Sequence, residues 1–168
     1  SISITYYSLC AVGTFMVVLG SAGILLINYK GYGLIDDITS TIAGVFGILV
    51  CLFPMVYSDD PNMKVGAFNL PSHISNVFHA ISAVVFFGAL AFMSFFLFTK
   101  TNGDMTKQKK IKNIIYRVCG VGMIASFLLL LLNKIPGVNI YNMVWIVETI
   151  ALFFFGLSWI VKSDAFPF

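Results

Sequence analysis

Both histidines of the chain, His73 and His79, stand at the entrance of one long apolar run. Imidazole changes its charge near neutral pH and is a common ligand of Zn²⁺. Asn76 lies three residues before His79, so the two would share one face of a helix. If acidic side chains reach the same place, the group could bind a polar ligand, hold a metal ion or lock helices together by hydrogen bonds.

The elements that position these side chains are predicted to be membrane-spanning helices. The chain is 59% hydrophobic and only 10% charged, whereas about a quarter of the residues of a soluble domain are charged. Helices of about 20 apolar residues cross a hydrocarbon core, in which the backbone must satisfy its own hydrogen bonds. We predict an all-α fold, an integral membrane bundle of five transmembrane helices that forms a single domain over residues 1–168. The predicted spans are Thr5–Ile27, Ile38–Tyr57, Asn76–Thr99, Ile114–Leu132 and Tyr141–Val161.

The distribution of lysine and arginine predicts the orientation of these spans. The segment between the third and fourth spans is rich in lysine, and basic residues gather on the cytoplasmic side of membrane proteins. With that segment inside, only Lys64 and Lys134 of the ten basic residues lie outside. We therefore expect a multi-pass protein of a bacterial cytoplasmic (inner) membrane, with its N-terminus outside and its C-terminus inside.

The lysine-rich segment itself has two interpretations. It could attract anionic lipid headgroups, or it could serve only to set the topology. Membrane lipids are the expected partners, and a homo-oligomer is left open. Nucleic-acid binding is not expected, because no stacking aromatic residues are interleaved with the basic ones. The candidate lipid contacts are Lys107, Lys109, Lys110 and Lys112.

A second candidate site, here called the outer cluster, lies at the outer ends of the spans. Glu148 stands well inside the fifth span, where an ionisable group is costly unless it is paired or hydrated. We therefore expect it to face the interior of the bundle. The candidate members of the outer cluster are Asp59, Asp60, His73, Asn76, His79, Trp145 and Glu148.

Three roles remain open for the outer cluster. It could lock the fold by hydrogen bonds, line a pocket for a polar headgroup or small solute, or hold a metal ion for hydrolysis. His73, His79 and Glu148 are weak candidates for metal ligands, since no HExxH spacing is present. No cofactor is predicted, and zinc is the one metal considered. We predict a protein that binds or senses a lipid or small amphiphile, with a metal-dependent membrane hydrolase and a small transporter or channel subunit as alternatives.

Two stretches resemble a known group of proteins. The first is His79-x-x-Ser82-Ala83-x-x-Phe86-Phe87, and the second is Trp145-x-x-Glu148-x-x-Ala151-x-x-Phe154-Phe155-Gly156-x-Ser158-Trp159-x-x-Lys162. They resemble a bacterial family of polytopic membrane proteins with a domain of unknown function, distantly similar to FRAG/DRAM-type proteins. The resemblance implies a bundle of five or six helices with a functional histidine and glutamate. CREST membrane hydrolases are similar in size class but use three histidines, and this chain has two.

Overall fold

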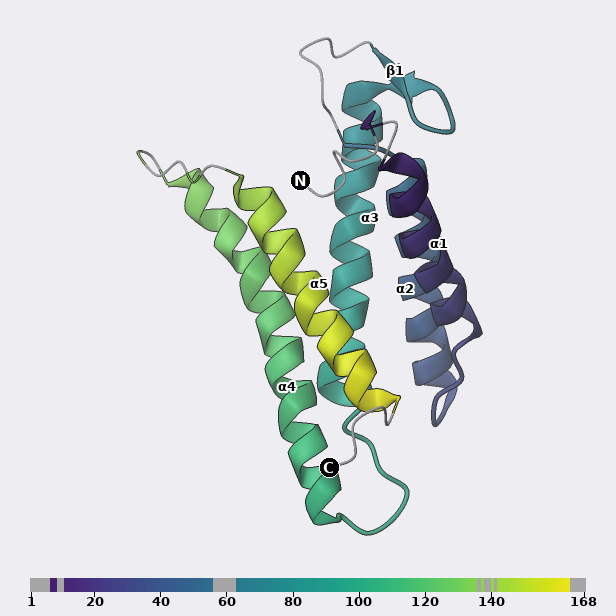
Figure 1. The fold of residues 1–168 in the computed structure, drawn as a ribbon, viewed down its shortest axis with the longest axis vertical. Helices are drawn as coiled ribbons and strands as arrows, with labels where there is room; N and C mark the ends of the chain where they lie inside the picture. Colours follow the sequence, from purple (N-terminus) through teal and green to yellow (C-terminus); the bar gives the residue numbers. More distant parts are fainter. Residues whose placement is uncertain are drawn as a thin grey trace. The chain divides into compact units, whose positions relative to one another are not determined.

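The structure is a computed structural model that describes residues 7–8, 11–55, 63–135, 137, 140 and 142–163. It is all-helical apart from one small β-hairpin, which confirms the predicted fold class (Figure 1). Helix α3 continues as a π-helix, Met93–Leu97, and α4 continues as a 3₁₀ helix, Leu129–Lys134. The helices are α1 (Val12–Asn28), α2 (Leu34–Leu52), α3 (Ser72–Phe92), α4 (Lys107–Leu128) and α5 (Met143–Lys162), and the strands are β1 (Lys64–Val65) and β2 (Leu70–Pro71).

Four of these helices are long and apolar enough to cross a membrane, namely α2, α3 with its π-helical continuation, α4 and α5. The chain is therefore a multi-pass membrane protein. Helix α1 is apolar but has only 17 residues, or roughly 25 Å of helix at 1.5 Å per residue. It is described from Val12, and the predicted start of this span, Thr5, lies outside the described residues.

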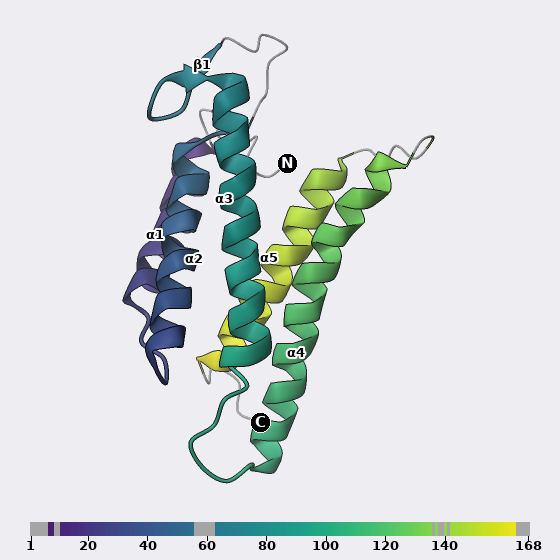
Figure 2. The same cartoon turned by 180° about the vertical axis from the view of Figure 1, so that it is seen from behind.

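The chain forms two compact units, residues 2–89 and residues 90–168. In the first unit, α1 and α2 run side by side as an antiparallel hairpin (Figure 2). They cross closely at two glycines: a Cβ atom on Gly23 would come within 2.9 Å of the Gly44 carbonyl oxygen. Small residues permit such close approach where lipid supplies no hydrophobic force between helices. On the other side of α2, the Phe86 ring of α3 packs against Gly47.

The second and third spans both have boundaries that differ from the prediction. Helix α2 ends at Leu52, five residues before Tyr57, because Pro54 forces the preceding Phe53 into an extended conformation (φ −112°, ψ 94°). The hairpin pairs Lys64 with Pro71 and Val65 with Leu70. Helix α3 then begins at Ser72, since a proline pre-sets the backbone at a helix start. His73, which the predicted span Asn76–Thr99 leaves outside, therefore lies in the first helical turn.

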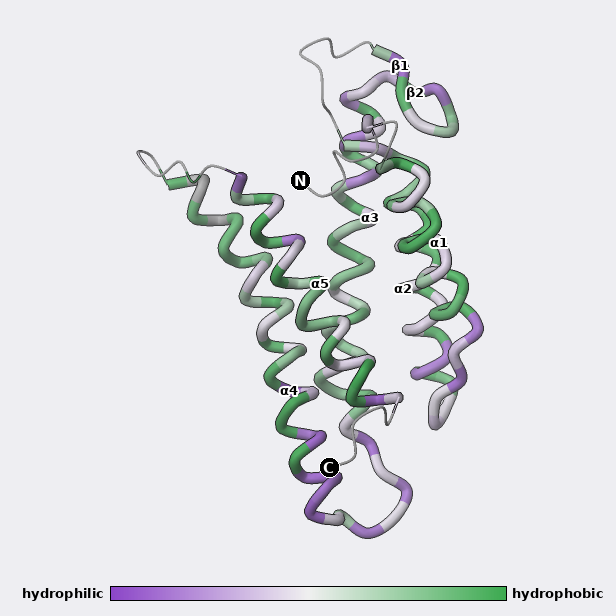
Figure 3. Tube along the Cα trace, in the orientation of Figure 1, coloured by the Kyte–Doolittle hydropathy of each residue, from purple (hydrophilic) through white to green (hydrophobic). Residues whose placement is uncertain are grey.

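In the second unit, α4 begins at Lys107, seven residues before the predicted Ile114. The Thr106 side chain caps this end by accepting the Lys109 backbone N–H at 3.1 Å, and lysine and glutamine are good helix formers. The first turns of α4 are the hydrophilic end of an otherwise apolar helix (Figure 3). Helix α4 packs against α5 and against the π-helix, where the Ser94 hydroxyl donates to the Tyr116 carbonyl at 2.9 Å.

Candidate functional site

His79 lies at the centre of the hydrogen bonds that join α3 to the end of α2. Its side chain is 4% exposed, and its Nδ1 atom lies 2.7 Å from the Phe53 carbonyl oxygen. A carbonyl oxygen only accepts hydrogen bonds, so Nδ1 must carry the proton and donate. In the neutral ring Nε2 is then the acceptor.

The hydrogen bond from His79 is one of four hydrogen bonds that are accepted by four consecutive backbone carbonyls at the end of α2, those of residues 52–55. Leu52 accepts from the Ala67 backbone N–H at 3.3 Å. Pro54 accepts from the Ser75 hydroxyl, and Met55 from the Tyr7 hydroxyl, both at 2.8 Å. Carbonyls at a helix end have no partner within the helix, and an unpaired one is costly away from water. His79 and Ser75 therefore supply donors that the backbone requires, which favours the fold-locking interpretation for this part of the outer cluster.

An aromatic surface lies next to this hydrogen-bonded end of α2. The Phe53 ring stacks on Phe68, from the turn between the strands, and on Phe78 of α3, with centroids 5.2 and 5.0 Å apart. Phe68 and Phe78 are 56% and 47% exposed. Gly66 enables the turn, since its φ of +76° is unfavourable for other residues and a Cβ atom there would come within 2.8 Å of the Leu52 carbonyl.

The members of the outer cluster are divided between the two units, and some lie outside the described residues. His73 is exposed, Asn76 is half-buried next to it on the helix, and Glu148 is half-buried on α5 in the second unit. Asp59 and Asp60 lie outside the described residues. Trp145 is 50% exposed. Over the described part of the chain, no three His, Cys, Asp or Glu side chains form a group that could hold a metal ion.

The four candidate lipid contacts on α4 are of two kinds. Lys107 and Lys110 are exposed and Lys112 is half-buried. Lys109 instead makes a hydrogen bond within the protein, from its Nζ atom to the Phe98 carbonyl at 2.9 Å. The same ammonium group lies 5.6 Å from the centre of the Tyr116 ring, within the range of a cation–π contact.

Lys162, the last residue of α5, is a member of the same group that the sequence analysis did not single out. Its Nζ atom lies 5.5 Å from the centre of the Phe98 ring. Phe98 also meets Tyr116 and Trp159 edge to face, at 5.5 and 5.7 Å between centroids. The sequence signal for this contact was the Trp159-x-x-Lys162 spacing at the end of a predicted span. Residues three apart lie on one helix face.

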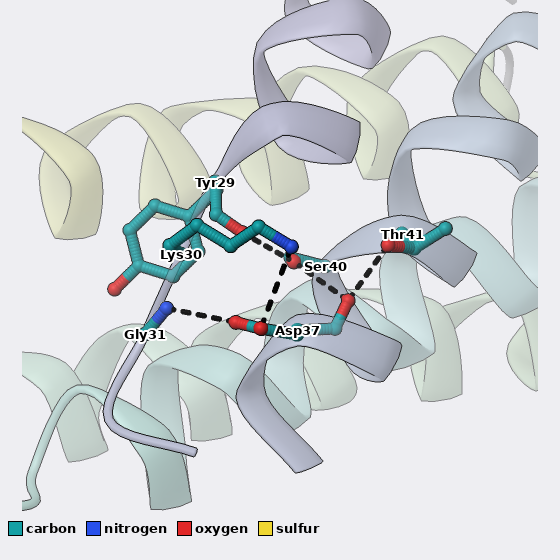
Figure 4. Close-up of polar contacts among 6 residues, drawn as sticks. All are labelled: Tyr29, Lys30, Gly31, Asp37, Ser40 and Thr41. Carbon is teal, nitrogen blue, oxygen red and sulfur yellow. Dashed lines mark hydrogen bonds and ion pairs between the residues drawn. The ribbon is translucent and has the colours of Figure 1, made fainter. Parts of the chain in front are cut away.

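A further polar group, also not anticipated, occupies the turn between α1 and α2 (Figure 4). The Asp37 carboxylate accepts the Gly31 backbone N–H at 3.1 Å and pairs with the Lys30 ammonium at 3.5 Å. The Ser40 hydroxyl reaches the Tyr29 carbonyl at 3.3 Å and the Asp37 carbonyl at 3.1 Å. These contacts fix the turn against the first turns of α2, where a negative side chain also complements the helix dipole.

Tyr29 is the residue of this turn whose pKa is raised. Its burial raises the pKa of the phenol above 10.0, and the nearby Asp36 carboxylate adds to the increase. Asp36 is 1% exposed and packs directly on Gly31, where a Cβ atom would collide with it. The turn is thus a tightly packed polar structure and not a loose loop.

The fold and these sites define a multi-pass helical membrane protein with several hydrogen-bonded polar groups at the ends of its helices. No family model matches the chain, and neither a curated protein nor a solved structure matches it. The family suggested by the two sequence stretches stays a prediction.

Proposed function

We propose that this protein is an integral protein of a bacterial cytoplasmic membrane that binds anionic lipids at its cytoplasmic face. The observation that carries the proposal is the exposure of Lys107 and Lys110, with Lys112 half-buried, at the start of a membrane-spanning helix. A lysine near an anionic membrane surface contributes about 1 kcal/mol to attraction. Since α4 begins at Lys107, these charges sit on one helix and would lie next to the headgroups of a membrane that this helix crosses.

The charge distribution supports the cytoplasmic assignment. Consecutive spans alternate in direction, so the start of α4 and the end of α5 face the same side as the turn between α1 and α2. Lys30, Lys162 and the lysines of α4 are on that side, whereas Lys64 and Lys134 are on the other. Such an asymmetry is typical of the cytoplasmic side.

The two tryptophans provide the test, because Trp145 and Trp159 lie near opposite ends of α5. Trp145→Phe leaves Trp159 as the single reporter, and Trp159→Phe is the matched control. The protein would be reconstituted with phosphatidylcholine and phosphatidylglycerol, of which one at a time carries brominated chains. We expect brominated phosphatidylglycerol to quench Trp159 more than brominated phosphatidylcholine, without such a preference at Trp145.

The preference at Trp159 should weaken with added salt, because exposed charges are screened. It should be strongly reduced in the triple variant Lys107→Gln, Lys110→Gln, Lys112→Gln. Equal quenching of Trp159 by both lipids at low salt would refute the proposal.

A second proposal concerns the outer end of the first unit, where the chain would bind the apolar part of a small amphiphile. The observation that favours it is the exposed aromatic surface of Phe68 and Phe78, stacked on Phe53. The hydrogen bond from His79 to the Phe53 carbonyl holds the residue that carries the central ring of this surface. A lysophospholipid with a diazirine in its chain should crosslink to Phe68 or Phe78, and crosslinking spread evenly over the exposed apolar residues of α3 would refute it.

A further inference from the structure

Two lysine ammonium groups of the second unit each lie over one ring of a buried aromatic pair. Lys109 lies 5.6 Å from the centre of the Tyr116 ring, and Lys162 lies 5.5 Å from the centre of the Phe98 ring. The two rings meet edge to face at 5.5 Å and are 2% and 1% exposed. An anion that contacts both ammonium groups would be attracted by each of them.

Lys109 is held in place for such a contact. Phe98 directly follows the π-helix, and its carbonyl oxygen accepts a hydrogen bond from Lys109 Nζ at 2.9 Å. This bond uses one of the three N–H donors of the ammonium group. A lysine fixed in this way has already lost much of its rotamer freedom, so binding an anion costs less conformational entropy.

Asn113 supplies an independent observation that points to a ligand. Across the described residues, its Oδ1 atom is the one buried side-chain oxygen or nitrogen without a hydrogen-bond partner. Its Nδ2 atom donates to the Met105 sulfur at 3.7 Å, so exchanging the two amide atoms would remove that contact. An unsatisfied buried acceptor is costly and calls for a donor. No side chain or backbone N–H of the described chain provides one.

Asn113 lies on the same face of α4 as Lys109. Lys109, Asn113 and Tyr116 are spaced four and three residues apart on α4, which puts them in one row along the helix. The row begins in the first turn of α4, and Lys162 comes from the last turn of α5. Since α4 and α5 are consecutive spans, both positions belong to the same end of this helix pair.

We propose that Lys109, Lys162 and Asn113 form a binding site for the headgroup of an anionic phospholipid that carries both a phosphodiester and a hydroxyl group. The two ammonium groups contact the phosphate, and the hydroxyl donates to Asn113 Oδ1. The acyl chains lie along the apolar surface of the helices. Phosphatidylglycerol has this chemistry. The site rests on the proposed function and deepens it, because it adds one specific lipid to a general attraction for anionic lipids.

The test is native mass spectrometry of the detergent-solubilised full chain with added lipid. We expect one phosphatidylglycerol molecule to stay bound, and Lys109→Gln and Lys162→Gln to weaken its binding about tenfold, the effect of one charge-assisted hydrogen bond. Lys30→Gln is the matched control, since it removes the same charge from a side chain that is 75% exposed and lies outside α4 and α5. An equal loss in the Lys30→Gln variant would overturn the proposal.

Phosphatidylmethanol tests the role of Asn113, because it has the same phosphodiester but no headgroup hydroxyl. The wild-type chain should bind phosphatidylglycerol more tightly than phosphatidylmethanol, and Asn113→Leu should remove this difference while both lipids still bind. The soluble headgroup glycerophosphoglycerol and inorganic phosphate should not displace the lipid. If either soluble compound displaced the lipid when present at the same concentration, the site would be one for soluble phosphates. That result would overturn the lipid assignment.

The outcome is distinguishable from failure of the proposed function. The triple variant of Lys107, Lys110 and Lys112 tests the general preference for anionic lipid at Trp159, and it leaves the three site residues intact. If that preference is present but no lipid stays bound in a one-to-one ratio, the specific site is refuted and the proposed function stands. If Trp159 shows no preference at all, the proposed function is refuted as well.

Discussion

The Nδ1 atom of His79 and the carbonyl oxygen of Phe53 lie 2.7 Å apart, so the side chain of one membrane-spanning helix satisfies the backbone at the end of another. The carbonyl has lost its helical partner because Pro54 ends α2 nearby.

This contact predicts how substitutions of His79 rank. His79→Ala leaves a buried carbonyl without a donor and should lower the free energy of unfolding by about 1–3 kcal/mol. In His79→Asn the amide nitrogen takes the place of Nδ1, so most of the loss should be recovered. His79→Gln places its amide nitrogen nearer to Nε2 and should recover less. Thermal unfolding in detergent measures the order.

His73→Ala is the control for this series, because His73 is exposed in the first turn of the same helix. Its effect should stay within about 0.5 kcal/mol. If the His79→Asn and His79→Ala variants were equally unstable, the hydrogen bond to Phe53 would not be the reason that this position needs histidine.

The number and type of the helices could be predicted from the sequence because uninterrupted apolar runs have one stable backbone solution in lipid. The ends of the helices could not be predicted in the same way. The segment from Lys107 to Asn113 is polar but made of good helix formers with a threonine cap, so α4 extends beyond its apolar run. Conversely, Pro54 ends α2 while the apolar sequence continues. Hydropathy describes the contact with lipid, whereas caps and prolines determine where the backbone starts and stops.

The candidate sites show a similar limit, since the decisive partners are backbone atoms. His79 donates to the Phe53 carbonyl and Lys109 to the Phe98 carbonyl, and no side-chain pattern marks either oxygen. Both carbonyls become acceptors only because a helix ends there. The sequence thus identified His79 and Lys109 as candidates but could not show what holds each of them.

The close crossing of α1 and α2 predicts opposite effects for two glycine substitutions. Gly44→Ala would place a methyl group against the Gly23 carbonyl oxygen and the Ile27 backbone, so the helices must separate and stability should fall by about 1–3 kcal/mol. Gly20→Ala has open space around the new methyl group and should be neutral or stabilising by up to about 1 kcal/mol, because alanine favours helix. Unfolding of both variants in detergent measures the difference, and equal stability would contradict the observed crossing.

The turn between α1 and α2 predicts that its two charged side chains are not equivalent. Asp37→Ala removes the acceptor of the Gly31 N–H and should cost about 1 kcal/mol. Lys30→Ala removes a side chain that is 75% exposed and that makes only a 3.5 Å contact to Asp37, so we expect almost no change. Hydrogen exchange at the Gly31 amide provides a local measure: it should accelerate in Asp37→Ala and not in Lys30→Ala.

Tyr29 predicts a loss of stability in alkali. Its folded-state pKa is raised above 10.0, so the unfolded chain releases the phenolic proton at a lower pH than the folded chain does. The contribution is fully present below pH 10.0 and is lost as the pH rises through the folded-state pKa. Tyr29→Phe removes this term and should flatten the decline of stability above pH 10.0. Phenolate absorbance in the wild type and in Tyr29→Phe should show one late-titrating group that the variant lacks.

The orientation of the chain is tested by two single cysteines in a background without Cys10, Cys51 and Cys119. Met63 and Gly103 are exposed and lie in connections on either side of α3, which crosses the membrane. With the lysine-rich end inside, a membrane-impermeant maleimide should label Met63→Cys in intact spheroplasts but Gly103→Cys only after lysis. The reverse pattern would put the lysines of α4 outside, away from the cytoplasmic leaflet, and both lipid proposals for that end of the protein would fail.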